Sequence, residues 1–183
     1  MPVRWSAWQR GWSSTVTIPP RADQSLVHCA LERWRTSVVV MTASAVLAEA
    51  LVADLAATAF SQSFTPYRAY LPIVDLAELA AIHVTVVVAG RTTQPISRTL
   101  LQVDHRIEVA VQQRLSGDGP AACDPLLALV EEIADHVAGH RLAGALDAAW
   151  VKTEHGPLVD PGHLNELRQF TSLLTLTYRT WET

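Results

Sequence analysis

Hydrophobic residues recur at helical spacing where the periodic pattern of the chain begins, at Ser44. Three leucines occupy every fourth position, and they are Leu47, Leu51 and Leu55. Residues four apart lie on one face of an α-helix, so the spacing predicts an amphipathic helix. Thr42 or Ser44 would cap this helix, because a hydroxyl oxygen accepts a hydrogen bond from a free N–H of the first turn.

Alternating apolar and polar residues then predict three β-strands. Residues 63–72 are aromatic and bounded by prolines, and Pro66 favours an edge strand or a bulge. Residues 82–90 alternate with period two and stop at a glycine. After a polar loop at 91–97, every second residue of 101–111 faces one way, so a hairpin with a projecting tip is expected. The solvent-facing side of its second strand would carry Asp104, Arg106, Glu108 and Gln112.

A second helix is predicted after the turn-forming sequence at 116–120. Asp124 is suited to the N-cap position. Pro125 is suited to the first helical position, where its missing N–H removes no helical hydrogen bond. Apolar residues then recur at helical spacing as far as Val137, which predicts a helix with one buried side.

Two more strands complete the pattern, at 146–154 and 168–181, and a loop with a short helical turn separates them. In the last strand the apolar and aromatic side chains share one face, and the threonines share the other. The order of elements is therefore α-β-β-β-α-β-β. This order predicts an α+β fold: a mainly antiparallel sheet of four to five strands with two main helices packed on it.

The composition restricts the classes of function. Hydrophobic residues make up 49% and charged residues 17% of the 183 positions, and this sparse charge favours a surface partly covered by partners, including copies of the same chain. The net charge of -4 disfavours nucleic-acid recognition, which normally uses a positive field. Glu49 and Asp54 interrupt the most apolar stretch, 37–60, so no membrane span is expected. A signal peptide is not expected either, because the stretch starts far from the N-terminus.

Residues 1–40 differ from the domain predicted at 41–183. They carry tryptophans among arginines, serines and prolines, with little periodic core pattern. They are interpreted as an N-terminal extension: a flexible leader, a segment upstream of a start at Met41, or an arm that packs on a neighbouring subunit. Tryptophan is a common interface anchor, so an arm would make its contacts through Trp5, Trp8 and Trp12.

The segment EEIADHVAGH, residues 131–140, raises the question of a metal site, because His136 and His140 are four residues apart. Their rings would converge on a continuous helix, but Gly139 stands where a left-handed glycine ends one. We therefore expect the two histidines to lie apart, with no metal or cofactor bound. His136 would instead complement the negative end of the helix dipole. The alternative is a metal site completed by the following loop, from His155, Asp160 and His163.

Other candidate chemistry is sparse. The sequence lacks the GxGxxG, GxxxxGK[ST] and GxSxG motifs, and with them the usual phosphate loops and the nucleophile elbow. Asp104 and His105 are successive strand residues, so their side chains should point to opposite faces. His83 and His105 are interpreted as ordinary strand histidines. We therefore predict no enzymatic activity and no catalytic residues.

Two segments, LLALVEEIADHVAGHRL and AAWVKTEHGPLVDPGHLNELRQFTSLLTLTYR, resemble tail-terminator or tail-completion (neck) proteins of tailed bacteriophages. In that family a helix of the LVEEIAD type precedes a W-V-K-T-E strand, and a terminal LxELRQFTS strand follows. The resemblance extends over about 41–178. The residues that carry it are Glu131, Glu132, Trp150, Lys152, Glu154, Leu167, Arg168, Gln169 and Phe170.

The resemblance implies a small α+β protomer that forms a ring, usually a hexamer, on the last ring of the tail tube. There it would end tube growth and join the tail to the neck or connector, in a virion assembled in the bacterial cytoplasm. On the hairpin, the expected contact residues are Arg91, Gln94 and Arg98. A head-completion or connector protein is the alternative in the same class. A small metal-dependent hydrolase that uses the histidines of 136–163, or a soluble bacterial binding domain, is the alternative from another class.

Overall fold

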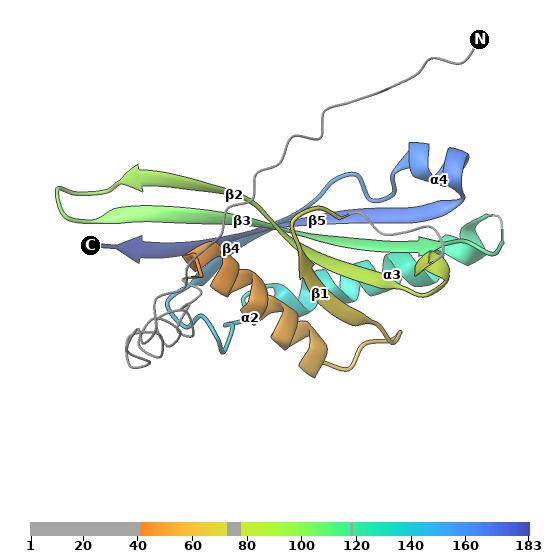
Figure 1. The fold of residues 1–183 in the computed structure, drawn as a ribbon, viewed down its shortest axis with the longest axis horizontal. Coiled ribbons are helices and arrows are strands. Elements are labelled where there is room, and N and C mark those ends of the chain that lie inside the picture. Colours follow the sequence, from red (N-terminus) through yellow and green to blue (C-terminus); the bar gives the residue numbers. More distant parts are fainter. Residues whose placement is uncertain (1–40, 73–77, 118) are drawn as a thin grey trace, which may run out of the picture. The chain divides into compact units, whose positions relative to one another are not determined.

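A computed structural model describes residues 41–72, 78–117 and 119–183 of the chain. In this part of the chain a five-stranded sheet, ordered β1-β2-β3-β5-β4, carries two long helices on one face (Figure 1). In chain order the elements are α2 (Ala43–Ala57), β1 (Thr65–Ala69), the 3-10 helix η1 (Glu78–Ala80), β2 (His83–Pro95), β3 (Leu101–Arg114), α3 (Pro120–Val137), β4 (Ala149–His155), α4 (Pro161–Leu167) and β5 (Gln169–Glu182).

The sheet is mainly antiparallel, as the sequence predicts. β2 pairs antiparallel with β3, β3 with β5, and β5 with β4. β1 is the exception, because it runs parallel to β2, with Thr65 opposite His83. Pro66 lies in this edge strand, where a residue without an N–H can face away from the ladder. The α+β class with two main helices is confirmed. The 3-10 helix η1 is an addition to the predicted elements, whereas α4 is the short helical turn expected before the last strand.

The first helix begins where its capping residue predicts. Oγ1 of Thr42 accepts a hydrogen bond from the N–H of Ala45 (3.3 Å), so Thr42 is the N-cap and Ser44 is not. Ser44 instead faces the core, where its hydroxyl is 2.8 Å from Nδ1 of His105. The three leucines of the predicted stripe are buried against the sheet. Their burial fixes which side of α2 faces β2 and β3.

The β2–β3 hairpin is longer than the sequence indicates. The predicted loop at 91–97 is wrong, because β2 continues to Pro95 and only 96–100 form the turn. The register shifts between Val88 and Gly90, so one extra residue forms a β-bulge. A glycine followed by polar residues is typical of a strand end. Here the bulge accommodates the extra residue without ending the strand. The β-branched residues after it pair with β3 as in a regular strand.

The core lies between one face of the sheet and the two long helices. On β3 the predicted alternation is confirmed for five of the six inward-facing residues, which are buried, whereas Leu101 at the start of the strand is 38% exposed. α3 and β5 contribute the other main parts of the core. The fully buried residues at its centre include Ile107, Val109, Leu129, Ile133, Leu174 and Leu176.

The opposite face of the sheet is more buried than predicted near the C-terminal end of β3. Asp104, Arg106 and Glu108 are at least partly accessible, but Gln112 is buried, and so the expectation of a fully solvent-facing side is wrong there. η1 packs against β3, and its Leu79 is buried. A short 3-10 helix has no strong sequence period, so its contact with β3 could not be predicted from the pattern.

The second long helix starts five residues before its predicted start. Pro120 opens α3, and Gly119, the N-cap, has a φ of 91°. The predicted N-cap Asp124 and first residue Pro125 therefore lie inside the helix. Two prolines were available for a helix start, and the glycine with positive φ allows the chain to turn before the first of them. Pro125 gives up one helical hydrogen bond as a consequence.

The remaining elements match the prediction closely. β4 and β5 form as strands, and α4 is the predicted helical turn between them. Asp160 caps α4 by accepting from the N–H of Gly162 (2.9 Å) and of His163 (3.1 Å). These two backbone donors keep the pKa of Asp160 below its usual value. Among the described residues, no helix is long and apolar enough to cross a membrane.

The packing of α3 on the sheet provides a test of this core. Replacement of the fully buried Ile133 by alanine should lower the free energy of unfolding by about 2–5 kcal/mol, because it leaves a cavity between helix and sheet. The matched change Glu131→Ala, on the exposed side of α3, should shift it by less than about 0.5 kcal/mol. Urea unfolding followed by circular dichroism measures both. Equal midpoints for the two variants would contradict this packing.

Candidate functional site

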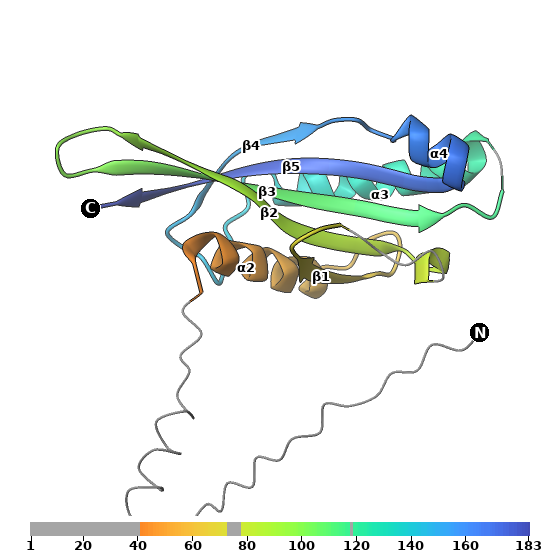
Figure 2. The ribbon, with the colours of Figure 1, turned by 45° about the horizontal axis from the view of Figure 1, so that its top comes forward.

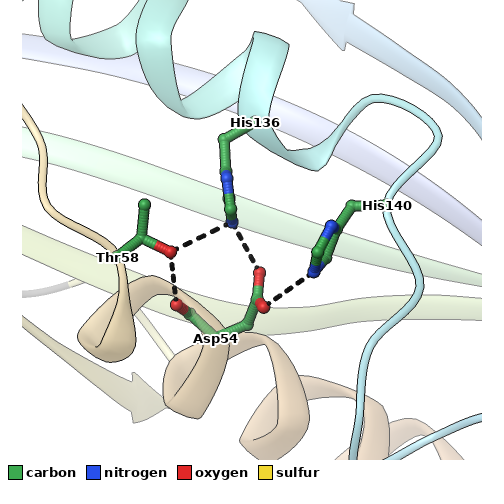
Figure 3. A network of polar contacts seen from close by, with 4 residues as sticks. All are labelled: Asp54, Thr58, His136 and His140. Carbon is green, nitrogen blue, oxygen red and sulfur yellow. Dashed lines mark hydrogen bonds and ion pairs between the residues drawn. The ribbon is translucent and has the colours of Figure 1, made fainter.

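Asp54, His136 and His140 meet near the C-terminal ends of the two long helices (Figure 3). Nε2 of His136 is 2.8 Å from one carboxylate oxygen of Asp54, and Nε2 of His140 is 3.0 Å from the other. The centroids of the two imidazole rings are 5.0 Å apart. Asp54 lies in the last turn of α2, His136 in the last turn of α3, and His140 in the segment that follows. We call these three residues the histidine–aspartate cluster.

The cluster corrects one inference from the sequence. α3 ends at Val137, and Gly139 has a φ of 73°, so the prediction that the helix stops before His140 is confirmed. The further inference that the two rings lie apart is wrong. The N–H of His140 donates to the carbonyl of Val137 (3.1 Å), and this tight turn returns His140 to the end of the helix. Asp54, 82 residues before His136, provides the carboxylate on which both rings converge.

Thr58 fixes the proton of one ring in the cluster. Its hydroxyl donates to the backbone carbonyl of Asp54 (2.9 Å) and lies 3.3 Å from Nε2 of His136. A hydroxyl has a single proton, and this one is used by the carbonyl. Nε2 of His136 must therefore be the donor to the Thr58 oxygen and to the Asp54 carboxylate.

The surroundings of the cluster are partly closed to water. The side chain of Asp54 is 16% exposed, that of His136 is 22% exposed and that of His140 is 43% exposed. The ring of Phe60 stands edge-on to His136, with 5.7 Å between centroids. Burial raises the pKa of Tyr178, and the negative charge of Asp54 adds to this rise. The tyrosine hydroxyl is buried and has no hydrogen-bond partner among the described residues.

The other residues considered as metal ligands lie elsewhere in the structure. Asp160 caps α4, and Nδ1 of His163 is 3.0 Å from the hydroxyl of Thr171. His155 is exposed at the end of β4. Within the described residues, the group that can hold a metal ion consists of the histidine–aspartate cluster alone. Sequence reasoning missed Asp54, since its only signal was a position off the leucine stripe of the first helix.

His105 and Asp104 point to opposite faces of the sheet, as predicted. Asp104 accepts two hydrogen bonds from the guanidinium of Arg179, at 2.7 and 2.9 Å, and this contact lowers the pKa of the carboxyl. His105 is fully buried between the hydroxyls of Ser44 and Thr180. Burial lowers the pKa of His105, because a charged imidazolium would lose its hydration. Its role is structural, which agrees with the interpretation of an ordinary strand histidine.

The three predicted hairpin residues occupy different environments. Arg91 lies within β2 and forms an ion pair with Glu182 of β5, with contacts of 2.7 and 2.9 Å to the two carboxylate oxygens. Gln94 is exposed near the end of β2. Arg98 is exposed in the turn, and its side chain makes no hydrogen bond or ion pair with the described residues. Trp5, Trp8 and Trp12 lie outside the described residues.

Apolar side chains are exposed at the same end of the sheet. Ile96 at the hairpin turn is 53% exposed, and Trp181 near the end of β5 is 51% exposed. Trp181 also lines a hollow of about 340 Å³ with Val46 of α2 and Leu146. Sequence reasoning missed these residues. For Trp181 a signal existed, because it lies on the threonine side of the last strand and not on the core side.

Comparison with known proteins leaves the family open. A scan against protein-family models gave no match, and a search of curated proteins found no similar sequence. The residues that carry the resemblance to tail terminators have structural positions here. Phe170 and Gln169 are buried at the start of β5, and Trp150 donates to the hydroxyl of Thr153 within β4 (3.0 Å). The other residues of the pattern are largely at the surface, with Glu131, Lys152, Glu154, Leu167 and Arg168 exposed.

Buried His105 should make stability depend on pH. Because its folded-state pKa is depressed, the unfolded chain binds a proton more readily, so the free energy of unfolding should fall as pH drops below about 6.5. One such proton gives a slope of at most about 1.4 kcal/mol per pH unit. Urea unfolding between pH 7.5 and 5.5 should show a shallower slope for His105→Gln than for the wild type. The exposed control His155→Gln should keep the wild-type slope, and an unchanged slope in His105→Gln would refute the effect.

Proposed function

We propose that the chain is a virion structural protein of the tail-terminator type. It forms a homo-oligomeric ring, expected to be a hexamer, at the head-proximal end of a phage tail tube. There it ends tube growth and joins the tail to the neck or connector, and it acts without catalysis. The resemblance of the sequence to tail-terminator proteins supports this proposal, and the α-β-β-β-α-β-β order of the described domain agrees with it.

The observation that carries the proposal is an end of the sheet that no other described element covers. β1 pairs with β2 only as far as Val87, and β4 pairs with β5 only as far as Arg179. Beyond these residues β2, β3 and β5 form a three-stranded ribbon that extends past the start of α2, as two views show (Figure 1, Figure 2). Within the described residues, both outer edges of this ribbon are without a paired strand. We call this part of the sheet the open ribbon.

An open ribbon is a ready surface for self-association. Unpaired N–H and C=O groups on an edge strand can pair with a strand from another chain, which proteins normally prevent by covering or charging the edge. Here the exposed apolar side chains of Ile96, Leu101 and Trp181 add apolar area at the same place. In a ring, each protomer would use one edge against a different surface of its neighbour, and this heterologous contact closes at the correct rotation.

The polar residues of the hairpin have separate roles in this proposal. Arg91 is held by Glu182, so its charge is partly neutralised before any partner binds. Arg98 carries a positive charge at the turn that no described residue pairs with, which suits contact with an acidic group of the neighbouring subunit or the tube protein. Gln94 provides an uncharged donor and acceptor near the end of β2 in the same hairpin. The net charge of -4 supports partners that are proteins, with no specific nucleic-acid recognition.

The alternatives differ in partner or in chemistry. A head-completion or connector protein would form a similar ring but bind the portal side, so the partner that it captures separates the two roles. A metal-dependent hydrolase was expected to use the histidines of 136–163. Among the described residues, His136 and His140 belong to the histidine–aspartate cluster and His155 and His163 do not, so that alternative would have to use the cluster without the other two histidines.

The mass of the protein in solution tests the ring. Light scattering after size-exclusion chromatography should give about six times the protomer mass of 20.0 kDa, either for the free protein or after addition of purified tail tubes. Ile96→Asp and Trp181→Ser should shift the protein towards the monomer, because each disrupts the open ribbon. Leu158→Asp and Tyr70→Ser, at exposed apolar positions elsewhere, should leave the mass unchanged. A wild-type chain that remains monomeric with and without tubes would exclude the proposed ring.

The proposed arm at residues 1–40 has a separate test. If Trp5, Trp8 and Trp12 anchor it on a neighbouring subunit, deletion of 1–40 should produce tails of irregular length or tails that fail to join heads. Electron microscopy of phage assembled with the truncated chain measures both defects. Tails of correct length that join heads normally would show that the arm is dispensable, while the ring proposed for 41–183 would remain.

A further inference from the structure

We infer that Asp54, His136 and His140 form a binding site for one divalent transition-metal ion, with Zn²⁺ as the preferred ion. This inference does not depend on the proposed ring function, because it concerns the junction of the two long helices and not the open ribbon. It reverses the expectation from the sequence that no metal binds. The reason for the reversal is the third ligand, Asp54, which the fold supplies.

The geometry of the cluster is close to that of a zinc site. The two imidazole nitrogens and the carboxylate oxygen that can act as ligands all lie within 4.8 Å of one another. Tetrahedral zinc with bonds of about 2.0–2.2 Å separates neighbouring ligand atoms by about 3.4 Å. In the structure, Nε2 of His136 and Nε2 of His140 are 2.8 and 3.0 Å from the carboxylate oxygens of Asp54. Movements on the order of 1 Å would therefore place the three ligand atoms around one ion. Side-chain rotation is sufficient for movements of this size.

The backbone holds the three ligands before an ion binds. Asp54 and His136 each lie in the last turn of a packed helix, and α2 and α3 share the hydrophobic core. His140 is held by the turn at Gly139, whose φ of 73° favours glycine. A preorganised set loses less conformational entropy on binding than ligands on a free loop.

Protonation of the cluster is compatible with metal binding. Nε2 of His136 carries a proton in the metal-free form, because the only proton of Thr58 is used by a carbonyl. An ion at Nε2 replaces this proton, which moves to Nδ1 through solvent and leaves a neutral ligand. The Thr58 hydroxyl keeps its bond to Asp54 throughout. Thr58 therefore stays in place as a neighbour of the metal ligands.

Electrostatics favour a cation at this point. The carboxylate of Asp54 is mostly withdrawn from water, and its contacts with basic side chains among the described residues are those with the two histidines. A hydrogen bond from an N–H group stabilises the carboxylate less than a bound divalent cation does. A divalent ion would do so, and it would replace two N–H contacts by three coordinate bonds.

The donor set selects the class of metal. Two imidazole nitrogens and one carboxylate oxygen suit Zn²⁺ and related transition-metal ions, whereas Mg²⁺ and Ca²⁺ prefer oxygen ligands. Three protein ligands leave a fourth position for water. His140 is the most exposed of the three, so solvent reaches the site from its side and gives the ion a path of entry. The bound ion would join the ends of α2 and α3 and stabilise their packing.

Metal titration of the untagged full chain, after treatment with a chelator, tests the site. One Zn²⁺ per chain should bind by calorimetry and elemental analysis, and the Tm should rise by roughly 5–10 °C when free Zn²⁺ exceeds Kd 100-fold. His140→Gln and Asp54→Asn should raise Kd at least about 100-fold, because loss of an outer-shell partner alone costs about 10- to 100-fold. Co²⁺ should give visible absorption bands in the wild type that these variants lose.

His155→Gln is the matched control, since it removes an exposed histidine outside the cluster and should keep the wild-type Kd. Circular dichroism of each metal-free variant shows whether it is folded, and His140 is exposed enough for substitution to leave the fold intact. Absence of Zn²⁺ binding to the wild type would overturn the inference. Equal Kd values for the wild type and folded His140→Gln would also overturn it, because the ion would then bind elsewhere. Either result would leave the ring proposal untouched.

Discussion

The burial of two helical stripes on one face of the sheet is the interaction on which the rest of this structure depends. The leucines of α2 and the apolar residues of α3 meet the inward side of β2, β3 and β5 in one continuous core. Removal of this apolar area from water provides most of the driving force for folding. Because the fully buried residues of each helix lie on one side of it, the core also fixes the rotation of the helix about its axis. Every polar residue on the two helices therefore has a defined direction.

The histidine–aspartate cluster follows from that packing. Asp54 lies one residue before the core residue Leu55, and His136 lies one residue before Val137. Both polar side chains are thus at the border of the core, near the ends of helices that the core holds together. A carboxylate and two imidazoles placed there are shielded enough to interact strongly and open enough to exchange ligands with solvent. The sequence pattern of either helix alone does not show that Asp54 and His136 are brought together.

Local order could be predicted from the sequence, and contacts between distant segments could not. The leucine stripe of α2, the alternation of β3 over residues 103–109 and the two faces of β5 were visible as periods, and these are confirmed. The start of α3 was misplaced because Pro120 and Pro125 are both suited to the first position of a helix. The cluster was missed because a turn at Gly139 and a ligand 82 residues away decide it together. Periodicity reports which side of an element is buried, but not which other element covers it.

The lengths of the elements explain why the two long helices leave one end of the sheet uncovered. A helix advances about 1.5 Å per residue and a strand about 3.3 Å, so α2 with 15 residues spans about 22 Å and β3 with 14 spans about 46 Å. Neither long helix matches the strands that it covers, even α3 with its 18 residues, at about 27 Å. Because the core fixes where each helix lies along the strands, the part of the strands that is longer than the helices extends beyond the start of α2. The described part of one protomer exposes that ribbon with its tryptophan and isoleucine, and the proposed ring of copies would cover it with the same chain.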